Sequence, residues 1–415
     1  MQAIVCLLSM LLVSLPGNAL QLVSWLVLPR RWSRMVSNAV YLCQGWTMLF
    51  FCDYLTNLEL VYYGDELPEG ESAIVISNHL GAEFVHFAQI AYRYGMIAGA
   101  RFVQKSPLKY IPINWTCYFH EDVFVKRGEG ADARLQATKM MGGLLASLTE
   151  DLLPSWLILF PEGTWVGGPA ENFLVERSQK FSKKMGLPVL DRVLAPRAAG
   201  FTAAIEGAVA ARQGALDRAW QSGMSKEGSI SPCVTRALYD FTFAYDDPIH
   251  PVELGKAMPP SVLHVIGGMK SGSKTPRKLH VYVKRVPLDP TEKNHDPLLM
   301  SEPGTYLQKS FEVKEKMLEE FSKKSAAGEA AELFPGRRFE PANTSFGAES
   351  SLMPMMMRLS ICLSIVAGSW YALWTLSAYL LGGYLSLVIG LSSVVAINVS
   401  WNEGEALPPS VNAGN

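Results

Sequence analysis

Four short stretches of this chain place residues that can move a proton or bind an anion where an apolar run meets a turn. In the first, Asn78-His79 follows the β-branched run Ile74–Ile76. Such runs are typical of buried strands, and a loop at the end of a strand can hold a histidine in a fixed place. Because histidine titrates near neutral pH, His79 is a candidate general base. Taken alone, this stretch is explained equally well by an ordinary surface-loop histidine.

Two further stretches end in cations. Phe124–Arg127 finishes in Lys126 and Arg127, and the apolar run Val193–Arg197 finishes in Arg197. A cation at a strand end is most often simply solvated, but a guanidinium can also bind a phosphate through two parallel hydrogen bonds. The sequence therefore offers two guanidinium groups as candidate ligands of an anionic substrate.

The remaining stretch, Phe160–Thr164, supplies a carboxylate. Pro161 breaks the apolar run before it, so that Glu162 and Thr164 stand in a turn. Gly163 lets another segment of backbone approach closely there. A Pro-Glu-Gly turn alone is usually only a turn, but four such stretches at successive predicted strand ends indicate a single site.

These stretches, in this order, resemble the four motif blocks of the glycerolipid acyltransferases, in particular the branch of 1-acyl-glycerol-3-phosphate and lysocardiolipin acyltransferases. The Phe-Pro-Glu-Gly-Thr block and the arginine strand are the specific parts of the likeness. The run Ser178–Pro188, the strands Leu238–Tyr245 and Leu279–Pro287, and an apolar tail of two segments also resemble this branch. The resemblance therefore covers nearly the whole chain.

The resemblance implies acyl transfer from acyl-CoA to the free hydroxyl of a lysophospholipid. A hydroxyl is a poor nucleophile at neutral pH, so His79 would take its proton during the attack on the thioester, and no acyl-enzyme would form. Acyl-CoA would be a co-substrate, and no further cofactor is expected.

Seven residues form the predicted substrate-binding set: Asn78, Lys105, Arg127, Glu162, Gly163, Thr164 and Arg197. The two arginines suit the phosphate of the acceptor because of their fork geometry. The turn at Phe160–Thr164 suits its glycerol and hydroxyl. Lys105 and Lys126 are candidates for a phosphate or for coenzyme A.

The first block departs from the family pattern. The family carries an aspartate five residues after the histidine, where it orients the imidazole, but this chain has Phe84 there. Glu83 is one residue earlier and one methylene longer, and we predict that it substitutes for the aspartate; a glutamate that merely starts a helix is the alternative. A glycine that the family carries shortly before its second block is also missing, and Glu121 and Asp122 occupy that region.

The spacing of Glu83 and His86 also has the form of a di-iron ligand pair. Such a site needs a second Glu-x-x-His and further carboxylates, which we do not find in the sequence. The six cysteines show no CxxC or other close pair, which argues against zinc and against a disulfide framework. The net charge of −1 gives no reason to expect nucleic-acid binding. The expected partners are therefore acyl-CoA, a lysophospholipid and a bilayer, with no metal and no nucleic acid.

Strand-like and helix-like stretches alternate from Tyr62 to about Lys324, which predicts an α/β domain with a mixed sheet flanked by helices. The predicted strands are 73–77, 123–126, 156–160, 193–195, 238–244 and 279–286, and two predicted helices are 131–148 and 311–324. The predicted organisation is N-terminal membrane-associated helices (1–61), an acyltransferase domain (62–325), a linker (326–354), a C-terminal transmembrane hairpin (355–402) and a tail (403–415).

The two ends of the chain are apolar. Met1–Leu28 carries no charge and is long enough to span a bilayer, and Met35–Cys52 is a second uncharged stretch. If both stretches crossed, the arginines between them would face the cytosol, and everything after Asp53 would lie on the far side of the membrane. We therefore expect the second stretch to lie in the membrane interface or to re-enter. Leu359–Asn402 is uncharged over the length of two spans, with Gly382-Gly383 near its middle, which predicts a helical hairpin.

The first expected reaction is conversion of lysophosphatidic acid to phosphatidic acid. Acylation of lysocardiolipin or another lysophospholipid is the alternative, and the altered first block keeps a catalytically impaired lipid-binding homologue open. A transporter is a poorer interpretation, because the long charged α/β region does not suit one. The endoplasmic reticulum membrane is the location that the resemblance implies, with the mitochondrial membrane as the alternative, although no arginine-rich leader supports the latter.

Overall fold

A computed structural model describes residues 2–50, 52, 58–111, 114–125, 131–221, 233–246, 254, 277–327, 333–339, 368, 371 and 375. The chain divides into two compact units, Met1–Cys362 and Leu363–Asn415, and the elements below belong to the first. The predicted C-terminal hairpin, three positions aside, and the predicted tail lie outside the described residues.

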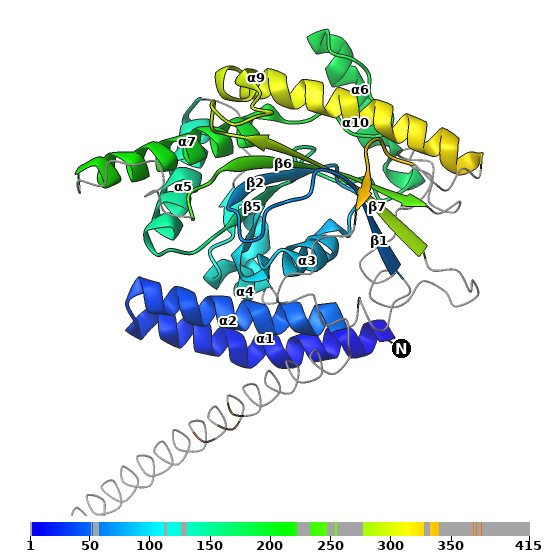
Figure 1. Cartoon of the computed structure of the whole chain (residues 1–415). Helices are drawn as coiled ribbons and strands as arrows, with labels where there is room; N and C mark the ends of the chain where they lie inside the picture. The colour runs from blue at the N-terminus through cyan, green and yellow to red at the C-terminus, as the bar shows by residue number, and fades with distance from the viewer. Residues whose placement is uncertain are drawn as a thin grey trace, which may run out of the picture. The chain divides into compact units, whose positions relative to one another are not determined.

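Within the described residues, eight strands form one mixed sheet in the order β4-β3-β5-β2-β6-β7-β1-β8 (Figure 1). The strands are β1 Leu58–Gly64, β2 Ala73–Ser77, β3 Ala100–Lys105, β4 Val123–Val125, β5 Trp156–Leu159, β6 Ala237–Asp246, β7 Arg277–Pro287 and β8 Arg338–Phe339. From β4 to β6 in this order, all neighbouring strands are parallel. Their carboxyl ends therefore meet at one edge of the sheet, where α/β proteins place their sites.

Helices cover both faces of the sheet, which confirms the predicted mixed α/β fold flanked by helices. Phe201 of α7 and Phe311 of α10 pack with the core on one face, and Phe87 and Ile90 of α3 pack on the other. The helices are α1 Gln2–Val27, α2 Arg30–Leu49, α3 Glu83–Arg93, α4 Trp115–Phe119, α5 Ala131–Glu150, α6 Asn172–Met185, α7 Ala198–Gln221, α9 Pro297–Ser301 and α10 Pro303–Ala326.

One predicted strand is wrong. Residues 193–195 form an irregular segment, although Val193 and Leu194 are buried as a strand would require. The backbone N–H of Leu194 donates to a Glu162 side chain, and that of Ala195 donates to the Ser178 hydroxyl. Because side chains already bind these N–H groups, the segment has no need of a neighbouring strand.

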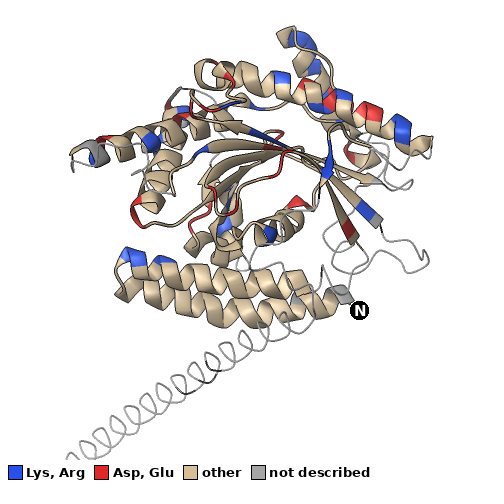
Figure 2. Cartoon of the chain, viewed as in Figure 1, with Lys and Arg blue, Asp and Glu red and all other residues tan. Residues whose placement is uncertain are grey.

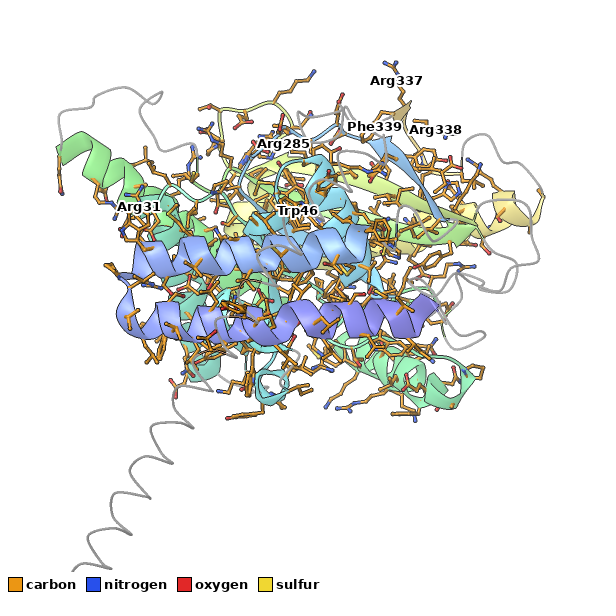
Figure 3. The ribbon with its side chains drawn as sticks, turned by 90° about the horizontal axis from the view of Figure 1, so that it is seen from below. Arg31, Trp46, Arg285, Arg337, Arg338 and Phe339 are labelled. Atoms are coloured by element: carbon orange, nitrogen blue, oxygen red, sulfur yellow. The ribbon has the colours of Figure 1, made fainter. Side chains whose placement is uncertain are left out.

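The helices α1 and α2 form an antiparallel hairpin against the α3 face of the domain (Figures 1 and 3). Of the described helices, only one stretch, Ile4–Val27, is long and apolar enough to cross a membrane. Polar side chains recur along its buried side: Ser14, Asn18, Gln21 and Ser24. Its other side exposes large apolar residues, among them Leu8, Leu12, Trp25 and Leu26. The described charges of the hairpin gather at its closed end, next to Arg31 (Figures 2 and 3).

Part of the stretch predicted as a linker packs on the domain. Leu333 and Phe334 are buried in the core, and β8 pairs antiparallel with β1. These residues cover the edge of the sheet that β1 would otherwise expose.

Candidate active site

His79 lies just beyond the end of β2, and two other groups hold its imidazole. Its Nδ1 lies 3.1 Å from Oε2 of Glu83, and its ring stacks on Phe160 with the ring centroids 4.4 Å apart. The side chain is 19% exposed. With Nδ1 facing the carboxylate, Nε2 is the nitrogen left to accept a proton from a substrate.

Glu83 begins α3 and is held in place by the loop before it. Both of its carboxylate oxygens accept the N–H of Gly81, at 2.9 and 2.8 Å, and its side chain is 1% exposed. Gly81 has a φ of +111°, a conformation that glycine adopts readily and other residues avoid. This tight turn brings position 83 beneath His79, whereas Phe84 is 42% exposed. The geometry is that of a carboxylate that orients an imidazole.

Burial and neighbouring charges shift the pKa of His79. Burial opposes its protonation, but the charge and hydrogen bond of Glu83 and the charge of Glu162 outweigh burial and raise the pKa of His79 above its usual value. Lys105, which ends β3 and is exposed, acts in the opposite direction. The charge of Lys105, one of the predicted substrate-binding cations, thus lowers the pKa of the imidazole.

The side chain of Glu162 binds two backbone N–H groups. Its side chain is buried; Oε1 accepts the backbone N–H of His79 at 2.8 Å, and Oε2 accepts that of Leu194 at 3.0 Å. Burial raises the pKa of Glu162 to about 8, although these N–H donors favour its charged form. The carboxylate thus joins the loop after β2 to the irregular segment before Arg197, and its contact with the glycerol of an acceptor stays a prediction.

Asn78 is likewise bound to the backbone. Its Nδ2 donates to the carbonyl of Phe243 at 3.0 Å, its Oδ1 accepts the N–H of Phe243 at 2.8 Å, and the residue is 1% exposed. Both hydrogen-bonding groups of the amide therefore extend the pairing of β2 with β6. These contacts fix the loop that carries His79, and a contact of Asn78 with substrate stays a prediction.

Arg197 lies against the Phe160–Thr164 turn. Its backbone N–H donates to the carbonyl of Pro161 at 2.8 Å, and its side chain is so close to Gly163 that a Cβ there would lie 3.3 Å from Arg197 Cδ. Gly163 also has a φ of +69°, so a side chain at this position would be strained as well as crowded. Thr164 is half-buried and Arg197 is exposed. Arg127 and Lys126 lie outside the described residues.

Two aromatic residues of the site were not assigned a role by sequence reasoning. Phe160 packs under the imidazole, and the 40%-exposed Trp165 lies against Gly81, where a Cβ would come within 3.2 Å of its ring. The available signals were the apolar residue directly before Pro161 and the glycine two residues after His79. Only the pairing of β2 with β5 brings these two loops together.

His86 is part of the packing beneath the site. Its Nε2 lies 2.5 Å from Tyr245 Oη and its Nδ1 lies 3.2 Å from Gln89 Oε1. Burial lowers the pKa of His86 to about 4, so the ring is neutral at physiological pH. Among the described residues, no group of three His, Cys, Asp or Glu side chains is arranged to hold a metal ion.

Curated proteins similar to this chain carry a common name. The chain is 27% identical over 336 residues to the Mus musculus 1-acyl-sn-glycerol-3-phosphate acyltransferase epsilon, covering 79% of this chain and 80% of that protein. It is 24% identical over 345 residues to the Bos taurus 1-acyl-sn-glycerol-3-phosphate acyltransferase delta, covering 81% and 78%. The chain is a relative of the glycerolipid acyltransferases. The names of these relatives are those of O-acyltransferases.

A plant relative is matched over less of its length. The chain is 25% identical over 279 residues to an Arabidopsis thaliana protein named "Probable 1-acyl-sn-glycerol-3-phosphate acyltransferase 5", covering 66% of this chain and 60% of that protein. It thus spans less than two thirds of that acyltransferase. No family model and no solved structure matches the chain.

One departure from the acyltransferase pattern lies at a turn with an unusual backbone conformation. In the region where the family carries a glycine, Glu121 has a φ of +65°, which lies in the left-handed region that favours glycine. Glu121 therefore has a backbone conformation that glycine adopts more readily, and its carboxylate binds Arg30 and Arg34 of α2.

The charge balance at His79 predicts a shift in the pH dependence of this acyltransferase relative. Burial lowers the pKa of His79, and Glu83→Gln removes the larger of the two carboxylate effects that raise it, leaving only that of Glu162. A general base must be neutral, so the acidic limb of kcat is expected to move to lower pH in the variant while the plateau falls. Profiles of kcat from about pH 5 to 9 for both proteins check this. An unmoved or higher limb would mean that another group sets it.

Proposed function

We propose that this chain transfers an acyl group from acyl-CoA to the free hydroxyl of lysophosphatidic acid, forming phosphatidic acid. The observation that carries the proposal is the contact of His79 with the buried carboxylate of Glu83 in a chain related to the glycerolipid acyltransferases. That contact restores the family's arrangement of base and carboxylate despite the shifted sequence position. It therefore weighs against a catalytically impaired homologue.

The proposed reaction assigns a role to each of these groups. Nε2 of His79 takes the proton of the acceptor hydroxyl as its oxygen attacks the thioester carbonyl, and Glu83 stabilises the imidazolium that forms. The carbon–sulfur bond then breaks, and the proton passes to the leaving thiolate, giving free coenzyme A. Arg197 and Lys105 are the described cations that would bind the acceptor's phosphate, together with Arg127.

We also propose that the α1–α2 hairpin lies along the surface of the bilayer. α2 is joined to the domain through Arg34, Asn38 and Gln44, which are spread along its length. A helix whose polar side is bound to a water-facing domain has no apolar surface on that side to offer lipid. The exposed apolar side of α1 is the surface that the hydrocarbon would cover.

This arrangement predicts that both ends of α1 lie on one side of the membrane. Tags placed before α1 and in the turn at Pro29 should react with a membrane-impermeant reagent from the same side of sealed vesicles. Labelling from opposite sides would show that α1 crosses the bilayer. The endoplasmic reticulum is the proposed membrane, and co-localisation with reticulum and mitochondrial markers tests it.

A lysolipid panel tests the reaction. Purified protein in detergent is expected to acylate lysophosphatidic acid from acyl-CoA, and His79→Ala is expected to lose activity by at least a factor of about 10². Transfer to lysocardiolipin or another lysolipid in preference would replace the first substrate with the alternative. A wild-type protein that binds lipids of the panel but acylates none of them would contradict the proposal.

A further inference from the structure

The contact between α2 and the domain follows one side of the helix. Tyr41 stacks on His120 with the ring centroids 3.9 Å apart, and Asn38 accepts from Arg101 at 3.3 Å. Gln44 donates to the hydroxyl of Thr116 at 2.7 Å. These contacts end at Arg34, where the helix meets the turn that contains Glu121. The hairpin is thus bound to the domain by side-chain chemistry along three turns of α2.

Arg34 is the most heavily bound of these residues. Its Nε donates to Glu121 Oε2 at 2.6 Å, and its Nη1 donates to Asp151 Oδ2 at 2.5 Å and to Ser147 Oγ at 2.8 Å. Its Nη2 donates to Glu121 Oε1 at 3.2 Å, and the side chain is 3% exposed. We call Arg34, Glu121, Ser147 and Asp151 the clamp.

The clamp reaches the segment that leads into the second motif block. Glu121 stands two residues before β4, and the next residue, Asp122, accepts from Gln104 of β3 at 2.7 Å. β3 ends at Lys105, and Arg127 follows β4 in the sequence. The clamp therefore connects the hairpin to β3, which ends in the candidate cation Lys105, and to β4, which the candidate cation Arg127 follows in the sequence. The left-handed backbone conformation of Glu121 is energetically unfavourable for a glutamate. The contacts of its carboxylate stabilise the turn in this conformation.

We propose that Arg34 is a positioning residue. Through the clamp it holds the site at a fixed height and tilt above the bilayer, here called its register, so that an acceptor embedded in the bilayer reaches His79. This inference rests on the proposed function. A rigid hairpin fixes the height and tilt of the site above the lipid, whereas a hairpin that moves independently presents the acceptor in many orientations. An acceptor dissolved in water does not depend on this register.

The test compares two acceptors. One is long-chain lysophosphatidic acid in phosphatidylcholine vesicles, and the other is a short-chain lysophosphatidic acid below its micellar concentration. Arg34→Met is expected to raise KM for the vesicle acceptor about tenfold or more, with kcat on the short-chain acceptor within about twofold of wild type. Glu121→Gly, which suits the backbone conformation but removes the carboxylate, should show the same split. Arg30→Met is the matched control, because Arg30 binds the same carboxylate at 3.1 Å but is 64% exposed.

Equal losses of kcat/KM on both acceptors in Arg34→Met and Glu121→Gly would overturn the proposal. They would show that the clamp supports the fold as a whole and not the position of the site above the bilayer. So would an unchanged KM for the vesicle acceptor. If the wild type acylates neither acceptor, the proposed function is contradicted, but the clamp remains to be tested. Hydrogen exchange of the 115–125 segment in vesicle-bound protein then tests the clamp. Protection lost in Arg34→Met and kept in Arg30→Met supports the clamp, and equal protection in both contradicts it.

Discussion

Glu83→Gln is expected to lower kcat by about 10²–10⁴, with a smaller change in KM. A glutamine can still fill the space, but it cannot stabilise the imidazolium that forms when His79 takes the proton. In the wild type the carboxylate is held by two contacts from Gly81 and lies 3.1 Å from the ring. Steady-state kinetics with acyl-CoA and lysophosphatidic acid measure the loss.

Returning the carboxylate to the family's usual position should not repair that loss. The double variant Glu83→Gln, Phe84→Asp carries an acidic residue five positions after the histidine, but side chain 84 is 42% exposed on this backbone, whereas side chain 83 is buried beneath His79. Phe84→Asp alone keeps Glu83 and is the control, expected to retain most of the activity. Recovery in the double variant would mean that the start of α3 can shift by a residue and that the turn at Gly81 does not fix the register.

Glu162→Ala is expected to lower kcat by at least about 10²-fold, because it releases the loop that carries the base. The substitution leaves the N–H groups of His79 and Leu194 without their acceptor, at a cost of about 1–3 kcal/mol each in the free energy of unfolding. Glu162→Gln keeps one acceptor oxygen and should fall between wild type and alanine. Kinetics and denaturant unfolding of the same preparations separate the two effects.

Glu171→Gln serves as the control for Glu162. Its carboxylate also accepts a backbone N–H, that of Gly167 at 2.7 Å, but it does not bind the loop of His79. We expect its kcat to stay within about threefold of wild type. If Glu162→Ala loses stability but keeps kcat, the carboxylate holds the fold and not the base.

The family resemblance together with the spacing of Glu83 from His79 was enough to predict which carboxylate approaches the histidine. His79 and Glu83 are four residues apart, and a tight turn at Gly81 makes up for the missing residue. The roles of Asn78 and Glu162 could not be predicted in this way. Polar residues in a motif suggest contact with substrate, but these two bind backbone groups that lie 165 and 83 residues away in the sequence. Nothing in the local sequence marks such distant partners.

The fold shows the same division between local and distant information. Apolar runs predicted β2 and β5 closely, since a buried parallel strand is apolar along its whole length. The run at Val193 is equally apolar but is buried beside side chains that take its N–H groups, so it is not a strand. Hydrophobicity reported the burial of this segment correctly, and only its hydrogen-bond partners distinguish the two outcomes.

The bonds of Asn78 and Glu162 also bear on how the protein folds. The loop of His79 is fixed by Phe243, which lies 165 residues from Asn78, and by Glu162, which lies 83 residues from His79. Closing such long loops is slow and costs chain entropy that only the assembled sheet repays. We therefore expect His79 to reach its geometry late in folding, after β6 has joined β2. A nascent or truncated chain that ends before Phe243 would carry every motif block and still lack a formed site.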